Sequence, residues 1–253
     1  MTTSIFKTIF LFFIFSIFIN ISSFCINIDS ILVETIDNYK NIKTIQSDII
    51  EKYYGPKGKE KYSGNYFSNG DFTKINFNKP YRQHILITKD SILWYFPDDR
   101  KIYIGLKLQK PDIKALQTEN NISKEYLNSD NYKIEKTIEK KLFSSRIKVV
   151  ATPKVKRTSK FSGIIIYINP KRSVITDAEY YDLAGNEIIE QHFRKFKNFN
   201  NIWLSTCITS KIFSSIGDIK TDIIYKNTFI NQNISDDNFI LKYPKGITTF
   251  KLF

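Results

Sequence analysis

The side chains that most often carry catalysis or bind metals are few and isolated in this sequence. His84 and His192 each lie within a run of strand-forming residues, with no second nitrogen or sulfur ligand at the spacing of a zinc site. Cys207 has no base near it in the sequence, so a buried strand cysteine is a better interpretation than a nucleophile. These residues predict neither a metal site nor a covalent mechanism.

Paired carboxylates and phosphate-binding loops give no chemical signal either. Asp98-Asp99 and Asp236-Asp237 lie in predicted turns, where the side chains of adjacent residues point apart. The sequence contains neither a glycine-rich phosphate loop nor a nucleophile elbow. We therefore expect no enzymatic activity, no bound metal and no cofactor.

The most informative stretch is Asp71–Leu106, where β-branched and aromatic residues form short runs separated by turn residues. This pattern predicts four consecutive antiparallel strands joined as hairpins, which we call the meander. In its third strand, Ile92, Trp94 and Phe96 share one face, and the residues between them are also apolar. Both faces must therefore be covered. Two ordinary layers of protein would do this, and so would one layer with the other face closing into an apolar trough.

The first 25 residues have the three parts of a secretory signal peptide: a basic start at Lys7, an apolar run and a polar exit. The apolar run is too short to span a bilayer comfortably. Cleavage after Cys25 would give an exported mature chain of residues 26–253. Two alternatives remain open, which are lipidation of Cys25 and an uncleaved membrane anchor.

The mature chain is long enough for one large domain, and no linker or internal repeat divides it. After cleavage Cys207 is the only cysteine, so no internal disulfide can form. The formal net charge is +13, but Lys and Arg are scattered rather than interleaved with aromatic residues as in a single-strand binder. We expect no nucleic-acid partner, whereas an acidic partner or an anionic membrane surface stays open.

Two helical regions flank the meander. Residues 28–42 place apolar side chains at helical spacing after a cap at Asp29 or Ser30, so they predict an amphipathic helix that covers one sheet face. Residues 111–129 contain two short helical segments, the second capped by Ser123, with few apolar side chains. Because such a segment cannot build a core, we interpret it as a mobile lid; a plain surface connection is the alternative.

Strands make up the rest of the chain. They are predicted at residues 44–54 and 61–68, and then at 132–143, 145–151, 161–168, 173–182, 186–196, 202–213 and 219–228. Few folds other than one large, strongly curved antiparallel sheet accommodate this order. We predict a mainly β (α+β) fold, a half-closed barrel with the N-terminal helix and the short helical lid at its opening.

Five segments resemble the outer-membrane lipoprotein carrier family, LolA, and its lipoprotein-sorting relatives. They are Gln46-Ser47-Asp48, Gly64-Asn65-Tyr66-Phe67, Lys79-Pro80, Ile92-Leu93-Trp94-Tyr95-Phe96-Pro97-Asp98 and Phe239-Ile240-Leu241-Lys242-Tyr243-Pro244-Lys245-Gly246. Their order and spacing match the family from about residue 29 to about residue 250. The third strand of the meander and the terminal segment carry the strongest similarity.

This resemblance implies a periplasmic carrier, or chaperone, with a helical lid over an apolar cavity. Such a carrier takes the acyl chains of lipoproteins released at the inner membrane and gives them up at the outer membrane. The implied partners are lipidated proteins, an inner-membrane lipoprotein-releasing transporter and an outer-membrane acceptor or membrane, with the carrier acting as a monomer. A lipid-binding sensor or regulatory module of the cell envelope is the alternative on the same scaffold.

Nine apolar residues are predicted to line the cavity: Phe72, Phe77, Ile85, Ile87, Trp94, Phe96, Ile113, Leu116 and Ile166. One face of the meander is expected to pack on residues 28–42 and the other to form the cavity wall. The sequence does not decide which strand parity faces the cavity. It departs from the family at Asn69-Gly70, where the carriers have an arginine that holds the lid closed. Gating by Arg82 or Lys74, or a more open mouth, are the alternatives.

Overall fold

The computed structural model describes residues 27–106, 119–127, 130–141, 144–155 and 161–252. The signal peptide expected at residues 1–25 and the predicted lid residues Ile113 and Leu116 lie outside these ranges. Within the described ranges, no helix is both long enough and apolar enough to cross a membrane.

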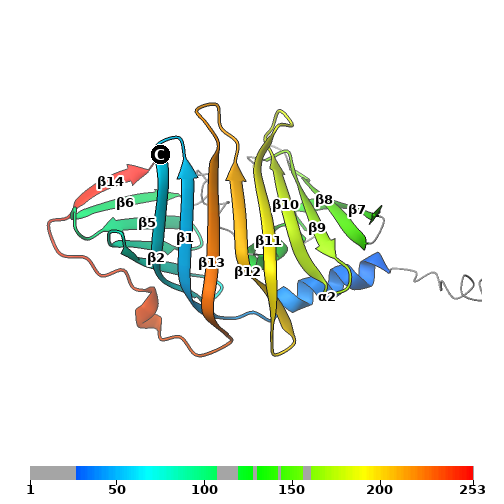
Figure 1. The fold of residues 1–253 in the computed structure, drawn as a ribbon, viewed down its shortest axis with the longest axis horizontal. Helices are drawn as coiled ribbons and strands as arrows, with labels where there is room; N and C mark the ends of the chain where they lie inside the picture. The colour runs from blue at the N-terminus through cyan, green and yellow to red at the C-terminus, as the bar shows by residue number, and fades with distance from the viewer. Residues whose placement is uncertain (1–26, 107–118, 128–129, 142–143, 156–160, 253) are drawn as a thin grey trace, which may run out of the picture.

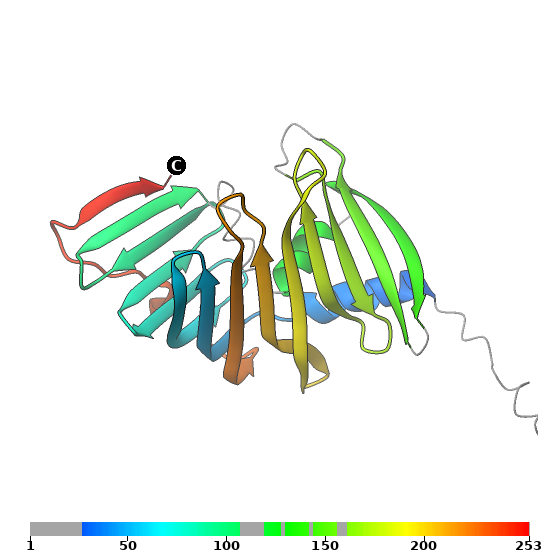
Figure 2. The ribbon, with the colours of Figure 1, turned by 45° about the horizontal axis from the view of Figure 1, so that its top comes forward.

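One continuous sheet dominates the molecule, and it curves without closing (Figures 1 and 2). Its described strands are β1 (Ile45–Gly55), β2 (Gly58–Ser68), β3 (Thr73–Lys79), β4 (Gln83–Ile87), β5 (Ser91–Phe96), β6 (Lys101–Leu106), β7 (Tyr132–Lys141), β8 (Ser144–Pro153), β9 (Gly163–Asn169), β10 (Val174–Tyr181), β11 (Glu187–Phe199), β12 (Ile202–Ile212), β13 (Ile219–Ile230) and β14 (Thr248–Leu252). They lie side by side in the order β14-β6-β5-β4-β3-β2-β1-β13-β12-β11-β10-β9-β8-β7. The predicted curved antiparallel sheet is confirmed, with one parallel exception. That exception is β14, which the sequence did not predict and which pairs with β6.

Irregular positions bend the long strands at the middle of the sheet. In β1 the register with β13 shifts between Gln46 and Asp48, and the Oγ of Ser47 donates to the Lys226 carbonyl at 2.7 Å. Lys195, within β11, has a φ of 55°, which is unusual for a residue other than glycine. Such bulges and left-handed residues increase local twist and bend the strand, so the sheet becomes a trough.

Two helices, α2 (Ile28–Lys40) and α4 (Glu119–Tyr126), lie on the concave face, behind the strands in Figure 1. The side chain of Asn27 caps α2 by accepting the N–H of Ser30 at 3.1 Å, so the predicted cap at Asp29 or Ser30 is wrong by a few residues. The helix packs against α4, β7, β10 and β12. The Tyr39 hydroxyl accepts the Ile175 N–H at 3.0 Å, beside a register shift in β10.

The second helix is part of the core, which corrects the expectation of a lid with few apolar anchors. Ile122, Tyr126 and Leu127 are 0%, 1% and 4% exposed and belong to the same apolar cluster as α2 and the sheet. Ser123 does not begin a helix, because it lies inside α4 and its carbonyl accepts the Leu127 N–H. The buried residues of α4 are three and four apart, at Glu119, Ile122, Ser123 and Tyr126, so a single face of the helix is buried.

The face of the meander opposite the concave side, which we expected the N-terminal helix to cover, is covered by the C-terminal segment. This segment contains the 3-10 helix η3 (Asp236–Phe239), whose Phe239 ring lies 6.1 Å from that of Phe72. The Lys74 Nζ also donates to the Ile240 carbonyl at 2.8 Å. The chain then continues into β14, so the terminal segment both covers the meander and extends its edge.

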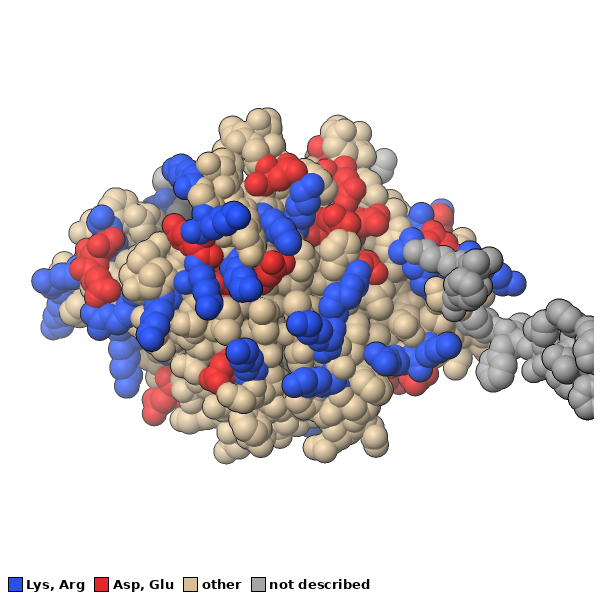
Figure 3. Space-filling model, in the orientation of Figure 1, with Lys and Arg blue, Asp and Glu red and all other residues tan. Residues whose placement is uncertain are grey.

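The outer face of the sheet, away from α2 and α4, carries the charge. In Figure 3, Lys and Arg side chains spread over this face with carboxylates between them. Arg194 pairs with Asp177 at 2.7 Å and Lys211 with Asp218 at 3.0 Å. The sheet therefore has a polar outer face and an apolar inner face.

Gly64 in β2 provides a test of how closely the meander joins the rest of the sheet. A Cβ at this position would lie 1.8 Å from the Asn76 carbonyl oxygen of β3. We expect Gly64→Ala to disrupt the β2–β3 pairing and to lower the free energy of unfolding by about 3 kcal/mol or more. The matched control is Gly163→Ala in β9, where the nearest atom would be 3.3 Å away, and its expected loss is about 1 kcal/mol or less. Urea unfolding followed by circular dichroism compares them, and equal losses would contradict this account.

Candidate functional site

Five of the nine predicted cavity residues share the concave face of the meander. The cross-strand register places Phe77, Ile85, Ile87, Trp94 and Phe96 on that side. Phe77 is 3% exposed, whereas the other four are half-buried. The structure therefore gives the strand parity that the sequence left open.

The other predicted residues lie elsewhere. Phe72 is on the opposite face, where it contacts Phe239, because it differs from Phe77 by an odd number of strand positions. Ile166 in β9 is fully buried within the apolar core of the β8–β13 half. It is on the concave side, but it is surrounded by packed side chains. Ile113 and Leu116 are outside the described residues.

One apolar or aromatic residue from each strand lies in register from β2 to β14, forming a feature that we call the cross-strand row. Its members are Tyr66, Ile75, Ile85, Trp94, Tyr103 and Phe250. The first two are buried, the next three are half-buried, and Phe250 is 38% exposed. At about 4.8 Å between neighbouring strands, the row is about 24 Å long. It leads from the filled centre of the trough to the edge of the sheet.

Aromatic contacts hold the outer end of this row together. The Tyr103 ring stacks on Phe250 at 5.0 Å and meets Phe96 edge-on at 5.6 Å, and Phe96 lies 5.1 Å from Trp94. The Trp94 Nε1 donates to the Oε1 of the buried Gln83 at 3.0 Å. Sequence reasoning missed Tyr103 and Phe250. Only the alternation of Thr248–Leu252 could have indicated a further strand.

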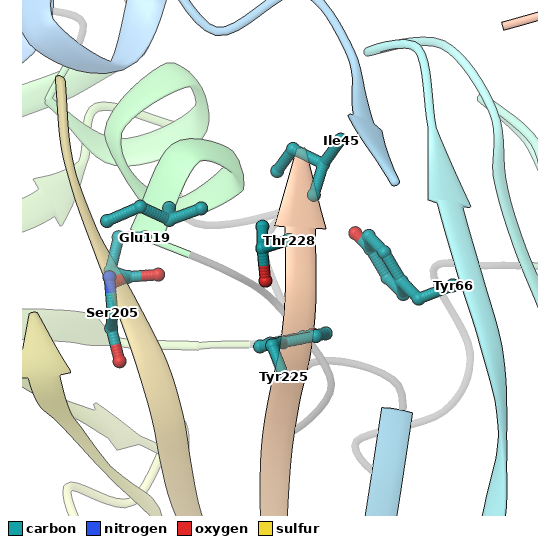
Figure 4. Close-up of a pocket in the computed structure, with 7 residues that line it drawn as sticks. Ile45, Tyr66, Glu119, Ser205, Tyr225 and Thr228 are labelled. Atoms are coloured by element: carbon teal, nitrogen blue, oxygen red, sulfur yellow. The ribbon is translucent and has the colours of Figure 1, made fainter. Parts of the chain in front are cut away.

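The inner end of the row opens on a small pocket where the start of α4 meets the sheet (Figure 4). The space between the lining side chains is about 240 Å³, part of it open to solvent, and the lining residues are Ile45, Tyr66, Glu119, Leu204, Ser205, Tyr225 and Thr228. The Tyr66 and Tyr225 rings meet edge-on with centroids 5.2 Å apart. The enclosed part of this space is water-sized, so it cannot hold an acyl chain.

Glu119 is the unusual group in this pocket, since it is a carboxyl group with no exposed surface. Its Oε1 accepts the Ser205 N–H at 2.9 Å, and its Oε2 has no hydrogen-bond partner among the described residues. Burial raises the pKa of Glu119 to about 8, against smaller opposing effects of backbone hydrogen bonds. The carboxyl group is therefore protonated at neutral pH. No sequence signal indicated this role, because an acidic residue before Asn120 resembles an ordinary surface position.

A second carboxyl group faces the same side of the sheet. Glu51 has the same parity in β1 as the buried Ile45 and Ile49, and desolvation raises its pKa to about 7. Burial is the main cause of the raised pKa of Tyr225, and the charges of Tyr66, Glu119 and Glu51 raise it further. The concave face is thus apolar with two carboxyl groups that are easily kept neutral.

The isolated residues considered first for chemistry have ordinary partners. The Nδ1 of His84 lies 2.8 Å from the Asn76 Oδ1, and the Nδ1 of His192 lies 2.7 Å from the Asp177 Oδ1 on the outer face. Cys207 is half-buried in β12 rather than fully buried. Among the described residues, no three His, Cys, Asp or Glu side chains gather as a metal site would require. This arrangement offers apolar contact surface and one polar anchor, which is suited to binding.

Arg82 and Lys74, which the sequence suggested as alternatives for holding the lid closed, form other interactions. Arg82 forms an ion pair with Asp98 within the meander. Lys74 donates to the Ile240 carbonyl of the C-terminal segment. Neither of these interactions reaches α4. Asn69-Gly70 forms the β2–β3 turn, where Gly70 adopts a φ of 90°.

Because the pKa of Glu119 is raised from 4.5 to about 8, folding takes up a proton between these pH values. The contribution of Glu119 to stability is therefore full at low pH and is lost as pH rises, by up to about 1.4 kcal/mol per pH unit. Glu119→Gln keeps the shape of the neutral acid but does not titrate. We expect the stability of this variant relative to wild type to increase from pH 5 to pH 8 in urea titrations. Parallel pH profiles of the two proteins would contradict a buried, protonated Glu119.

Three solved structures share this fold. A LolA superfamily protein from Nitrosomonas europaea is 15% identical, with 84% of this chain and 97% of that chain covered and a TM-score of 0.61. A putative outer membrane lipoprotein-sorting protein domain from Vibrio parahaemolyticus is 14% identical, with 83% and 94% covered and a TM-score of 0.63. A DUF1329 family protein from Desulfovibrio piger is 14% identical, with 83% and 95% covered and a TM-score of 0.65. At these identities the similarity establishes the fold.

The sequence itself matches a family model over residues 115–243, about half of the chain. The description of that model is "-like: Uncharacterized protein". No curated protein matches the sequence. The matched region begins before α4 and ends in the C-terminal segment that covers the meander. The chain therefore belongs to this uncharacterized-protein-like family, and its fold is that of the LolA superfamily proteins and lipoprotein-sorting domains.

Proposed function

We propose that residues 26–253 form a periplasmic carrier that binds the acyl chains of lipoproteins and shuttles them from the inner to the outer membrane. In this proposal the signal peptide at residues 1–25 exports the chain and is removed. The observation that supports the proposal most is the cross-strand row. Its half-buried aromatic side chains face the same concave surface as the apolar core, and α2 packs against the other half of the sheet, at β7, β10 and β12.

The geometry suits reversible binding of an acyl chain. A chain lying along the cross-strand row gains on the order of 0.8 kcal/mol for each methylene that it fully buries. A chain held on one face of a sheet buries only part of its surface, so the total gain stays moderate. A carrier needs such a balance, because its guest must leave again at the acceptor.

The partners follow from this role. They are lipidated proteins as cargo, an inner-membrane transporter that releases them and an outer-membrane acceptor or the membrane itself. We propose that the carrier acts as a monomer and as a binding protein rather than an enzyme. The side chains at the pocket support this, because the Ser205 hydroxyl donates to backbone carbonyls of Arg194 and Cys207 and is not paired with a base.

In the Trp203→Phe variant, Trp94 is the single tryptophan of the chain, so the fluorescence of this variant reports on the surroundings of Trp94. We expect a diacylated lipopeptide to shift the Trp94 emission to shorter wavelength, and the same peptide without acyl chains to leave it unchanged. Phe96→Ala should weaken lipopeptide binding about tenfold or more, because a buried aromatic contact contributes about 1.5–3 kcal/mol.

The matched control is Phe72→Ala, which removes an equally large ring from the opposite face of the meander. It should leave the affinity for the lipopeptide unchanged. If the lipopeptide does not alter Trp94 emission, or if the Phe96 and Phe72 variants bind it equally well, the carrier proposal is wrong.

A further inference from the structure

The pocket at the inner end of the cross-strand row contains one polar atom that the protein does not use. Glu119 is fully buried, and its Oε2 has no hydrogen-bond partner among the described residues. Buried polar atoms are nearly always hydrogen-bonded, so an exception in a pocket indicates a group that a ligand completes. Glu119 lines that pocket together with largely apolar side chains.

Neighbouring polar groups are engaged with other partners. The Ser205 Oγ donates to the Arg194 carbonyl at 2.8 Å, and the Thr228 Oγ1 lies 3.0 Å from the Ser47 Oγ. The Tyr66 hydroxyl interacts with the side chains of Thr73 and Ser68. None of these interactions reaches the Glu119 Oε2. The atom therefore faces the pocket without a competitor from these side chains.

The protonation state decides what kind of group fits. The Oε1 of Glu119 accepts a backbone N–H, so the proton of the neutral acid lies on Oε2. A protonated Oε2 donates a hydrogen bond and needs an acceptor from its ligand. The carbonyl oxygen of an ester or amide is such an acceptor, and every acyl group carries one at the head of its chain.

We propose that Glu119 donates a hydrogen bond through Oε2 to the acyl carbonyl of a long-chain ester or amide whose hydrocarbon tail lies along the cross-strand row. This inference rests on the proposed carrier function and adds the chemical class that the site selects. The enclosed space beside Glu119 is water-sized, so it has room for a single carbonyl oxygen and not for the tail. The row begins at Tyr66, in the wall of this pocket, and leads away from it for about 24 Å.

Other titratable groups around Glu119 do not interfere near neutral pH. Those that interact with it electrostatically are Tyr39 on α2, Tyr66 on β2 and Tyr225 on β13, and burial raises the pKa of each. All three are therefore neutral below pH 10. Glu51 on β1 interacts with Tyr225 and titrates near pH 7, so measurements of Glu119 need a variant in which only position 119 changes.

The test compares two ligands that differ only in the carbonyl group, 1-O-lauroylglycerol and 1-O-dodecylglycerol. Their affinities for the Trp203→Phe protein are measured at pH 7 through Trp94 emission. We expect the ester to bind about tenfold more tightly, because the ether lacks the acceptor for one hydrogen bond. An N-lauroyl peptide should share the advantage of the ester if lipoprotein amides use the same site. A preference for the glyceryl ester over this peptide would instead identify free acyl lipids as the guests.

Variants at position 119 separate the hydrogen bond from the shape of the pocket. Glu119→Gln keeps a donor at the same place and should keep the ester preference at pH 7 and at pH 9. The wild-type protein should lose the preference at pH 9, above the pKa of about 8. Glu119→Leu should bind ester and ether equally; if this variant does not fold, the pH comparison with Glu119→Gln decides.

The outcomes distinguish this inference from the carrier proposal. If the wild-type protein binds ester and ether equally well, the inference about Glu119 is wrong, but the proposal of acyl binding is retained. A water molecule would then be the hydrogen-bond partner of the Glu119 Oε2. If the ester preference survives in Glu119→Leu, the carbonyl is recognised elsewhere. If neither ligand binds at all, both proposals fail.

Discussion

The structure depends on covering the apolar concave face of a sheet that does not close. A closed barrel would fill its interior with its own side chains, but an open trough needs other elements to cover it. Here α2 packs on β7, β10 and β12, and α4 packs on α2 and meets the sheet at β12, β1 and β2. Two polar contacts fix these helices in the apolar interior. The Tyr39 hydroxyl of α2 accepts a strand amide at 3.0 Å, and the Glu119 carboxyl of α4 accepts another at 2.9 Å.

The proposed binding surface lies on the half of the sheet that α2 does not pack against. On β2 to β6 and β14, the same concave face continues with partly exposed aromatic side chains, from Trp94 to Phe250. The C-terminal segment covers the opposite face of these strands.

Much of the fold could be predicted because its signals are local. Turn residues and alternating apolar runs located the hairpins from β1 to β13. Of the two covered faces that the apolar run from Ile92 to Phe96 predicted, the structure shows one, which lies under the C-terminal segment. What covers each face could not be predicted, because packing of the C-terminal segment on Phe72 joins residues far apart in the chain. The parallel pairing of β14 with β6 could not be predicted for the same reason. Glu119 was missed because its burial depends on where a short helix meets β12, which no periodicity in eight residues reveals.

The central claim is that an acyl guest lies across the concave face of the meander, with its head at the α4 pocket. Photo-crosslinking tests this most directly, using a lipopeptide with a diazirine at the end of one acyl chain and peptide mass spectrometry to locate the adduct. The account predicts adducts on Trp94, Phe96, Tyr103 or Phe250. Adducts in β8 to β10, or on the outer face at Phe72 or Phe239, would contradict it.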